Sequence, residues 1–336
     1  MSPTAPRLRA GLIGLGAMGR HHARVLSTLD GVDLVGVLDP APDAITPHGV
    51  PLLAELDVLL AMDIDYAVMA CPTGLHEEIG LRLADEGVHA LIEKPLAPSV
   101  EASRTLVEAF ERRGLIGAVG HIERYNPALQ NLRSRLENGD LGDLYQVVTR
   151  RQGPFPGRIG DVGVVMDLAT HDIDLTAWVT GHDYVDVSAR TVSRSGRPHE
   201  DMVSAVARLD NGVIATHLVN WLSPFKERSI IITGTKGCFV ADTLTADLTF
   251  HANGAIDTEW EVLRAFRGVA EGDTIRYAIP KREPLLVEHE RFRDAVEGKD
   301  SDIVTLAQGL RAVEVAAAIL TSAREGSTVH VPLTER

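Results

Sequence analysis

The sequence predicts an α/β protein of two domains: a doubly wound parallel sheet over residues 1–120, then an α+β domain with an open, mainly antiparallel sheet over residues 121–336. Three observations support this. Apolar strands alternate with helical segments up to residue 120, a glycine-rich turn follows the first strand, and consecutive strands predominate afterwards. A chain of 336 residues is also too long for one ordinary core and fits two.

The first domain has the pattern of repeated βαβ units. Continuous apolar strands flanked by helices indicate a parallel sheet that is covered on both faces. We expect strands at residues 8–14, 32–38, 64–70, 88–92 and 116–120, and helices at residues 17–29, 75–87 and 100–113.

The second domain is richer in strands. The turn residues Asp210-Asn211-Gly212 lie between two β-rich runs, which indicates a hairpin and antiparallel pairing. We assign to this domain helices at 127–138, 166–179, 285–296 and 306–323, and strands at 144–150, 185–193, 202–209, 213–221, 229–234 and 238–241.

Composition excludes several classes of protein. A formal net charge of -14 argues against a nucleic-acid partner, because phosphate binding needs a basic surface. Cys71 and Cys238 lack the spacing of a metal site or a disulfide framework, so we expect no metal. No apolar run reaches the length of a membrane span, and the first nine residues contain no apolar signal-peptide region, so we expect a cytoplasmic protein without a membrane partner.

A GxGxxG motif between the first strand and the first helix indicates a dinucleotide site. Its glycines would permit a tight turn and let backbone N–H groups reach a pyrophosphate at the positive end of the helix. A glycine-rich turn without a ligand is the alternative, but the strand before and the helix after the motif favour binding. The candidate contact residues are Gly14, Gly16, Ala17, Met18 and Gly19.

The choice of cofactor follows from charge. Asp39 ends the second strand, 20 residues after Gly19, where an acid accepts hydrogen bonds from the adenosine ribose. It could instead cap the loop before Pro40. Residues 25–81 contain no lysine or arginine, so a 2′-phosphate would face a carboxylate without a nearby cation from this stretch. We therefore expect NAD as the cofactor.

Glu93-Lys94-Pro95 directly follows a strand of the first domain. Ligands of open parallel sheets bind outside the carboxyl ends of the strands, so these residues should lie at the ligand edge. Oxidation of an alcohol needs a base for the hydroxyl proton and a cation for the developing alkoxide, and Lys94 could serve either need. A solvated lysine beside a proline is the alternative.

A second polar group lies in the helix predicted at residues 166–179. Asp167, His171 and Asp174 have the spacing i, i+4, i+7, which predicts one shared helix face. A carboxylate one turn from an imidazole can orient it and stabilise its protonated form. From spacing alone, an ordinary polar face is the alternative.

The motifs together resemble the Gfo/Idh/MocA family of sugar and cyclitol oxidoreductases. GLIGLGAMGRHHARVL, CPTGLHEEI, EKPLA and DLATHDIDL occur in the family's order across nearly the whole chain. The resemblance implies an N-terminal Rossmann domain that binds NAD and a C-terminal domain for substrate binding and oligomerisation. The exposed face of the second sheet would form the subunit contact of a homodimer or homotetramer.

The resemblance also implies roles for individual residues. Lys94, Asp167 and His171 would act at the substrate, with His171 as base, and Lys94 would also lie beside the cofactor. Glu93 would lie near the nicotinamide ribose. The other residues implied near the nicotinamide are Cys71, Thr73 and His76, although a surface histidine at a helix start is an equal alternative for the last of these.

Two features depart from the commonest family pattern. Leu168-Ala169-Thr170 stands where the family often has a glycine, which affects the local backbone of the motif. Residues 120–127 and 220–228 resemble the subgroup that contains UDP-N-acetylglucosamine 3-dehydrogenases. That similarity implies substrate-binding roles for Arg124, Asn126 and Lys226, with the two cations as partners for a diphosphate.

The sequence thus predicts an NAD-dependent dehydrogenase that oxidises a secondary hydroxyl of a sugar, at C3 of a nucleotide (UDP-) sugar by resemblance. One alternative is a dehydrogenase of a free polyol such as myo-inositol, which would need no diphosphate site. The other is a non-catalytic dinucleotide-binding sensor, which would need Asp39 but neither Lys94 nor His171.

We predict that NAD binds at least about tenfold more tightly than NADP, a difference of roughly 1.4 kcal/mol. The physical reason is repulsion between the 2′-phosphate and Asp39 in a stretch without cations. Titration with both cofactors measures the difference, and Asp39→Ala should narrow it. Equal or tighter binding of NADP would contradict the prediction.

Overall fold

The computed structural model describes residues 7–157, 162–254 and 271–333, and the chain forms two compact units. Unit 1 comprises Met1–Ile122 and Glu283–Glu314, and unit 2 comprises Glu123–Arg282 and Val315–Arg336. The chain therefore returns to the first unit near its end. Our assignment of both closing helices to the second domain is wrong, because one helix and part of the next belong to unit 1.

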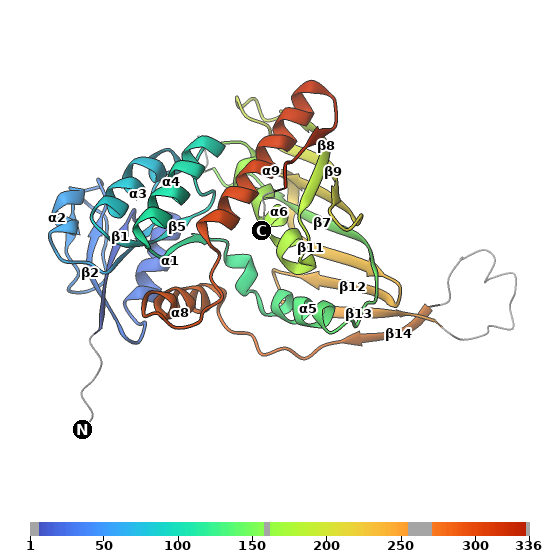
Figure 1. Ribbon diagram of the computed structural model, residues 1–336, viewed down its shortest axis with the longest axis horizontal. Coiled ribbons are helices and arrows are strands. Elements are labelled where there is room, and N and C mark those ends of the chain that lie inside the picture. Colours follow the sequence, from blue (N-terminus) through green and yellow to red (C-terminus); the bar gives the residue numbers. More distant parts are fainter. Residues whose placement is uncertain (1–6, 158–161, 255–270, 334–336) are drawn as a thin grey trace, which may run out of the picture. The chain divides into compact units, whose positions relative to one another are not determined.

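Unit 1 contains a parallel sheet with the strand order β3-β2-β1-β4-β5-β6. The strands are β1 Leu8–Ile13, β2 Val32–Leu38, β3 Leu52–Leu53, β4 Tyr66–Met69, β5 His89–Glu93 and β6 Gly117–Gly120. The helices are α1 Ala17–Leu26, α2 Leu56–Leu60, α3 His76–Asp85, α4 Val100–Arg113 and α8 Pro284–Val296. The chain runs outward from β1 in one direction and from β4 in the other, so right-handed crossovers put helices on both faces (Figure 1). The predicted doubly wound sheet is confirmed.

The core of unit 1 needs a residue from the far end of the chain. Leu12, Val68 and Leu91 of the sheet are at most 1% exposed, and Phe292 of α8 belongs to the same apolar cluster. The Phe292 ring meets Tyr66 edge to face, with ring centroids 5.3 Å apart. This packing explains why α8 joins unit 1: its apolar face covers part of a sheet made about 200 residues earlier in the sequence.

Unit 2 contains a mixed sheet with the order β14-β13-β12-β11-β7-β10-β9-β8-β15, in which β10 pairs with β7 in parallel and the other pairs are antiparallel (Figure 1). The strands are β7 Leu144–Pro154, β8 Tyr184–Val192, β9 Met202–Leu209, β10 Ile214–Asn220, β11 Leu222–Gly234, β12 Gly237–Asp242, β13 Asp247–Asn253, β14 Glu271–Arg276 and β15 Val329–His330. The helices are α5 Pro127–Glu137 and α6 Thr170–Thr180. Burial alternates along β9, as expected for a sheet with one covered face.

Several short elements escape prediction from the sequence. β13 alternates polar and apolar residues, and we did not assign it from the sequence. β3 is only two residues long, and β14 is a polar run without clear alternation. β3 and β14 form because a neighbouring strand edge offers backbone partners, which is tertiary information.

The helix α9, Leu306–Glu325, is divided between the units at Glu314. Among the described residues it is long and apolar enough to span a membrane by length and composition, and half of it is buried in the fold. Core helices of globular proteins pass the same test, so this feature is weak evidence for a span.

His217 on β10 provides a test of the second core. It is 1% exposed; its Nδ1 lies 2.8 Å from Thr149 Oγ1 and its Nε2 lies 2.9 Å from the Tyr184 hydroxyl. Burial lowers the pKa of His217 to about 4, whereas an unfolded histidine titrates near 6.5. Between these values the unfolded chain binds a proton that the folded chain does not.

We predict that this histidine removes about 2 kcal/mol of stability between pH 7.5 and pH 5. The loss of unfolding free energy is absent above the pKa that His217 has in the unfolded chain, and it grows as pH falls toward the pKa that His217 has in the folded chain. Denaturant unfolding of the wild type and of His217→Gln at both pH values measures it. The glutamine variant should lose less stability on acidification, and equal losses in the two proteins would contradict the assignment.

Candidate active site

The glycine loop of unit 1 joins β1 to α1. Gly14 has φ +91°, and a Cβ there would lie 2.6 Å from the Ala70 carbonyl oxygen. A Cβ on Gly19 would lie 2.1 Å from the Gly14 carbonyl oxygen, so the first and third glycines permit close backbone packing. A Cβ on Gly16 would meet nothing within 4 Å, which leaves open space beside the loop.

The start of α1 also fits a dinucleotide. Its N-cap residue is Gly16, and no side chain caps the helix there. Backbone N–H groups of Ala17 and Met18, in the first turn, thus meet no capping side chain and can bind an anion at the positive end of the helix. The residues present therefore fit the pyrophosphate of NAD.

Asp39, directly after β2, is tied to the glycine loop. Its Oδ2 accepts a hydrogen bond from Leu15 N–H at 2.6 Å, and its Oδ1 accepts one from Ala41 N–H at 2.9 Å. A carboxylate oxygen can accept more than one hydrogen bond, so both oxygens keep capacity for ribose hydroxyls. The loop-capping role and the ribose role are compatible, and Asp39→Ala would also loosen the glycine loop.

The loop after β4 carries three of the predicted residues. Cys71 is partly buried, and burial raises the pKa of its thiol to about 11, so it stays neutral. Thr73 begins a single 3-10 turn, Thr73–Leu75. His76 is 1% exposed: its Nε2 lies 3.1 Å from the Cys71 carbonyl oxygen and its Nδ1 lies 3.1 Å from that of Pro95. The surface alternative for His76 is wrong, because the ring links the loops after β4 and β5.

Glu93 ends β5 and Lys94 follows it. One carboxylate oxygen of Glu93 lies 2.9 Å from His22 Nε2, and the other accepts a hydrogen bond from Lys94 N–H at 3.1 Å. Burial alone would raise the pKa of Glu93, but the hydrogen bond from His22, the charge of Lys94 and the hydrogen bond from Lys94 N–H together lower it. Lys94 is half-buried at the carboxyl edge of the sheet, as the sequence predicts.

Asp167 and His171 belong to unit 2, where the backbone differs from the predicted regular helix. Asp167 lies in a π-helical turn, Val165–Ala169, and His171 lies in the first turn of α6. The turn passes into α6 at the segment that departs from the family pattern. Single π turns inside helices often occur at functional sites. Asp167 is 5% exposed and His171 is half-buried.

Asp174, the third residue of the predicted helix face, has an ionic partner of its own. Asp174 pairs with Arg124, whose Nε lies 2.9 Å from its Oδ2, and both side chains are at most 7% exposed. Asp174 therefore holds an arginine, and Asp167 and His171 remain as the candidate catalytic pair.

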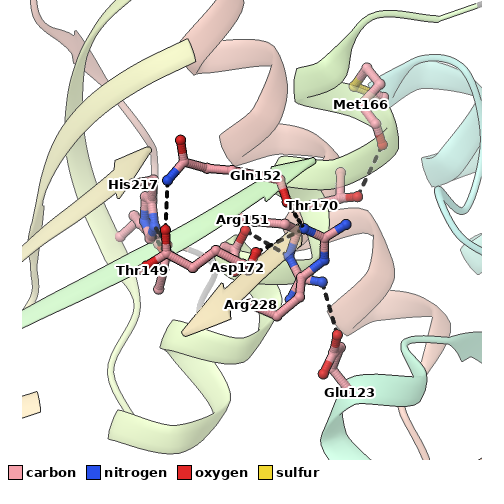
Figure 2. A network of polar contacts seen from close by, with 11 residues as sticks. Glu123, Thr149, Arg151, Gln152, Met166, Thr170, Asp172, His217 and Arg228 are labelled. Atoms are coloured by element: carbon pink, nitrogen blue, oxygen red, sulfur yellow. Dashed lines mark hydrogen bonds and ion pairs between the residues drawn. The ribbon is translucent and has the colours of Figure 1, made fainter. Parts of the chain in front are cut away.

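A buried ionic network that the sequence did not predict joins β7 to α6 and to Glu123 (Figure 2). Arg151 on β7 donates from Nε to Asp172 at 2.9 Å and from Nη1 to Glu123 at 2.8 Å. Burial disfavours its charge, but these two carboxylates raise the pKa of Arg151. The available signal was an arginine at an inward position of a strand.

Arg228 on β11 extends the network. Its Nη1 donates to the carbonyl oxygens of Gln152 at 2.6 Å and Glu227 at 2.9 Å. Burial and the charge of Arg151 lower the pKa of Arg228, and the charge of Asp167 is one of those that oppose this. Among the described residues no hydrogen bond engages its Nε or Nη2.

The remaining predicted residues have different surroundings. Arg124 forms the buried ion pair with Asp174 described above. Asn126 caps α5: its Oδ1 accepts from Ala128 N–H at 3.0 Å and its Nδ2 donates to the Thr243 carbonyl at 2.9 Å. Lys226 is exposed on β11. Structural contacts thus account for Arg124 and Asn126, and Lys226 remains a candidate anion ligand.

Comparisons with known proteins bear on both units. A model of the oxidoreductase family with NAD-binding Rossmann fold matches residues 8–121, and a GFO/IDH/MocA C-terminal domain model matches residues 129–240. The chain is 34% identical to UDP-N-acetylglucosamine 3-dehydrogenase of Acidithiobacillus ferrooxidans over 212 residues, 62% of this chain and 65% of that one. It is 26% identical to scyllo-inositol 2-dehydrogenase (NAD(+)) of Bacillus subtilis, over 97% of this chain and 96% of that one.

Solved structures agree with the fold. UDP-N-acetylglucosamine 3-dehydrogenase GnnA from Acidithiobacillus ferrooxidans superposes with a TM-score of 0.82 at 28% identity, over 95% of this chain and 98% of that one. GenD2 from gentamicin A biosynthesis, solved with NAD, superposes with a TM-score of 0.82 at 25% identity, over 98% of this chain and 97% of that one. The chain therefore belongs to the Gfo/Idh/MocA family of oxidoreductases, and its first unit is the NAD-binding Rossmann domain of that family.

Proposed function

We propose that this sugar oxidoreductase oxidises a secondary hydroxyl at C3 of a nucleotide (UDP-) sugar to a keto-sugar. The observation that carries the proposal is the pair formed by Asp167, in the π turn, and His171, in the first turn of α6, together with the half-buried cation Arg228, whose pKa the charge of Asp167 influences. Oxidation of an alcohol needs a base for the hydroxyl proton, and binding of an anionic substrate needs a cation. The similarity to UDP-N-acetylglucosamine 3-dehydrogenase supports the choice of sugar.

In the proposed reaction His171 takes the proton of the hydroxyl group, and Asp167 stabilises the imidazolium that forms. Lys94 stabilises the negative charge that develops on the same oxygen. When bound, NAD supplies the hydride acceptor, so the carbon loses a hydride and the oxygen a proton. The products are a ketone, NADH and one proton. The convergence of Lys94 with His171 on one substrate is part of this proposal.

A free polyol is the second candidate substrate. The chain matches scyllo-inositol 2-dehydrogenase over 97% of its length, further than it matches the UDP-sugar enzyme in sequence. A polyol would engage the same base and lysine but leave Lys226 and Arg228 without a diphosphate. Side-by-side assays with UDP-sugars and free polyols distinguish the two.

We also propose a cytoplasmic homodimer or homotetramer that associates through the outer face of the second sheet. Val206 and Ile214 are 46% and 39% exposed, and register places both on the uncovered face of β9 and β10. Apolar side chains there suit a subunit contact.

We predict that Lys94→Ala and His171→Ala each lower kcat by about 10² or more, as loss of an acid–base group does. Binding of NAD should change little, because neither side chain is assigned to the pyrophosphate or the adenosine ribose. His182→Ala is the matched control, since His182 is a partly exposed histidine of unit 2 paired with Asp210. Near-wild-type turnover in both test variants would show that the assigned site is wrong.

The proposed diphosphate group of the substrate leads to a separate prediction about KM. KM for the UDP-sugar should rise with salt, because the net charge of -14 repels the substrate and local cations must bind it. Lys226→Ala should raise KM more than it lowers kcat, since Lys226 would contact a remote part of the substrate equally in ground and transition states. Lys236→Ala, which removes another exposed lysine of unit 2, should leave KM unchanged.

Turnover of free inositol or glucose, with no activity on any nucleotide sugar, would reject the diphosphate and favour the polyol. A KM that does not depend on salt would also count against it, though less strongly, because buried ion pairs are screened poorly.

A further inference from the structure

Two buried histidines and the largely buried Glu93 form a hydrogen-bonded chain inside unit 1. Glu93 Oε1 lies 2.9 Å from His22 Nε2, and His22 Nδ1 lies 2.8 Å from His289 Nε2. The two histidines are 0% and 1% exposed. They come from α1 and α8, whereas Glu93 ends β5, so three elements far apart in sequence meet at one carboxylate.

The partners fix the direction of these hydrogen bonds. An ionised carboxylate only accepts, so His22 Nε2 carries a proton and donates it to Glu93. In the neutral ring Nδ1 is then bare, and it accepts from His289 Nε2–H. His289 Nδ1 is left bare, and among the described residues it has no hydrogen-bond partner. The reverse arrangement would bury an N–H group without an acceptor, which is rarer than a bare acceptor.

The other side of the Glu93 carboxylate is equally constrained. Lys94 N–H donates to Oε2 at 3.1 Å. A Cβ on Gly120 of the neighbouring strand would lie 3.2 Å from Glu93 Cδ, so the glycine packs closely against the carboxylate. Both oxygens are therefore held in place.

A second carboxyl group, that of Glu288, lies in the same part of unit 1 but is not expected to add to the negative charge of Glu93. Glu288 on α8 is 1% exposed, and neither of its oxygens has a hydrogen-bond partner in the described part of the chain. Burial and the charge of Glu93 raise the pKa of Glu288 well above its ordinary value, which favours its neutral form. Glu93 is the anion of this cluster.

We propose that His22 and His289 are positioning residues that hold Glu93 as a fixed anion at the cofactor edge of the sheet, where its charge favours binding of NAD⁺ over NADH. Glu93 lies at the carboxyl end of β5, the edge at which open parallel sheets bind ligands. NAD⁺ carries one positive charge more than NADH, on the nicotinamide ring. A fixed negative charge at this edge discriminates between the two forms by Coulomb attraction.

The test measures Kd for NAD⁺ and for NADH on the full chain by fluorescence titration, without substrate. His289→Leu removes the donor to His22 without touching Glu93 or the cofactor. It should lower the preference for NAD⁺ about tenfold, as expected when a charged group loses hydrogen-bond support. His289→Gln keeps an amide N–H in the position of Nε2 and should retain the preference. Glu288→Gln is the matched control and should also retain the preference, because the buried carboxyl that it replaces has no hydrogen bond to Glu93 or to either histidine.

Three outcomes would overturn the proposal: equal weakening of both cofactors in His289→Leu, which is a purely structural effect; no change in that variant; or a shift in Glu288→Gln as large as in His289→Leu. If His289→Leu does not fold, ¹⁵N chemical shifts of the histidine rings in the wild type decide instead. A protonated Nε2 and a bare Nδ1 on His22 would support the proposal, and the opposite tautomer would overturn it. None of these measurements depends on the identity of the sugar.

Discussion

Parallel pairing of β1, β4, β5 and β6 is the constraint on which the cofactor side of this protein depends. Ile13 pairs with Met69, Met69 with Ile92, and Glu93 with Gly120, so the strands end at nearly the same level. Segments that are far apart in sequence therefore begin their loops at one edge of the sheet. The glycine loop after β1, the loop after β4 that carries Cys71 and the loop after β5 that carries Lys94 lie at this edge because of the backbone register. Contacts made by side chains then fix the conformations of these loops.

Buried histidines form several of the contacts that fix these loops. His76 joins two of these loops through backbone carbonyls, and His22 fixes the carboxylate that precedes Lys94. Each replaces water as the partner of polar groups that the fold removes from solvent, where an unsatisfied group costs about 1–3 kcal/mol. In unit 2, buried arginines have the corresponding role. Arg124 pairs with Asp174 and Arg151 with Asp172, which orients α6, the helix that carries the proposed base His171.

Most of unit 1 could be predicted from the sequence because local signals and global topology agree there. Apolar runs, the glycine motif and the acid after the second strand each specify a position that the structure keeps. The membership of α8 could not be predicted, since an amphipathic helix does not reveal which sheet it covers. In the site, Lys94 and Asp39 followed from their places at strand ends. The π turn and the Arg151 network could not be predicted, because both arise from side chains that meet only after folding.

The position of α8 in the chain has a consequence for synthesis. A ribosome releases the strands of unit 1 first, and the helix that supplies Phe292 and His289 emerges only after the whole strand-rich part of unit 2. Until then Tyr66 lacks its ring partner and His22 lacks its donor. The nascent Rossmann sheet therefore remains incompletely covered while residues 121–283, nearly half of the polypeptide, are translated. Unit 1 can therefore complete its fold only after α8 has been synthesised, although all strands of its sheet are available much earlier.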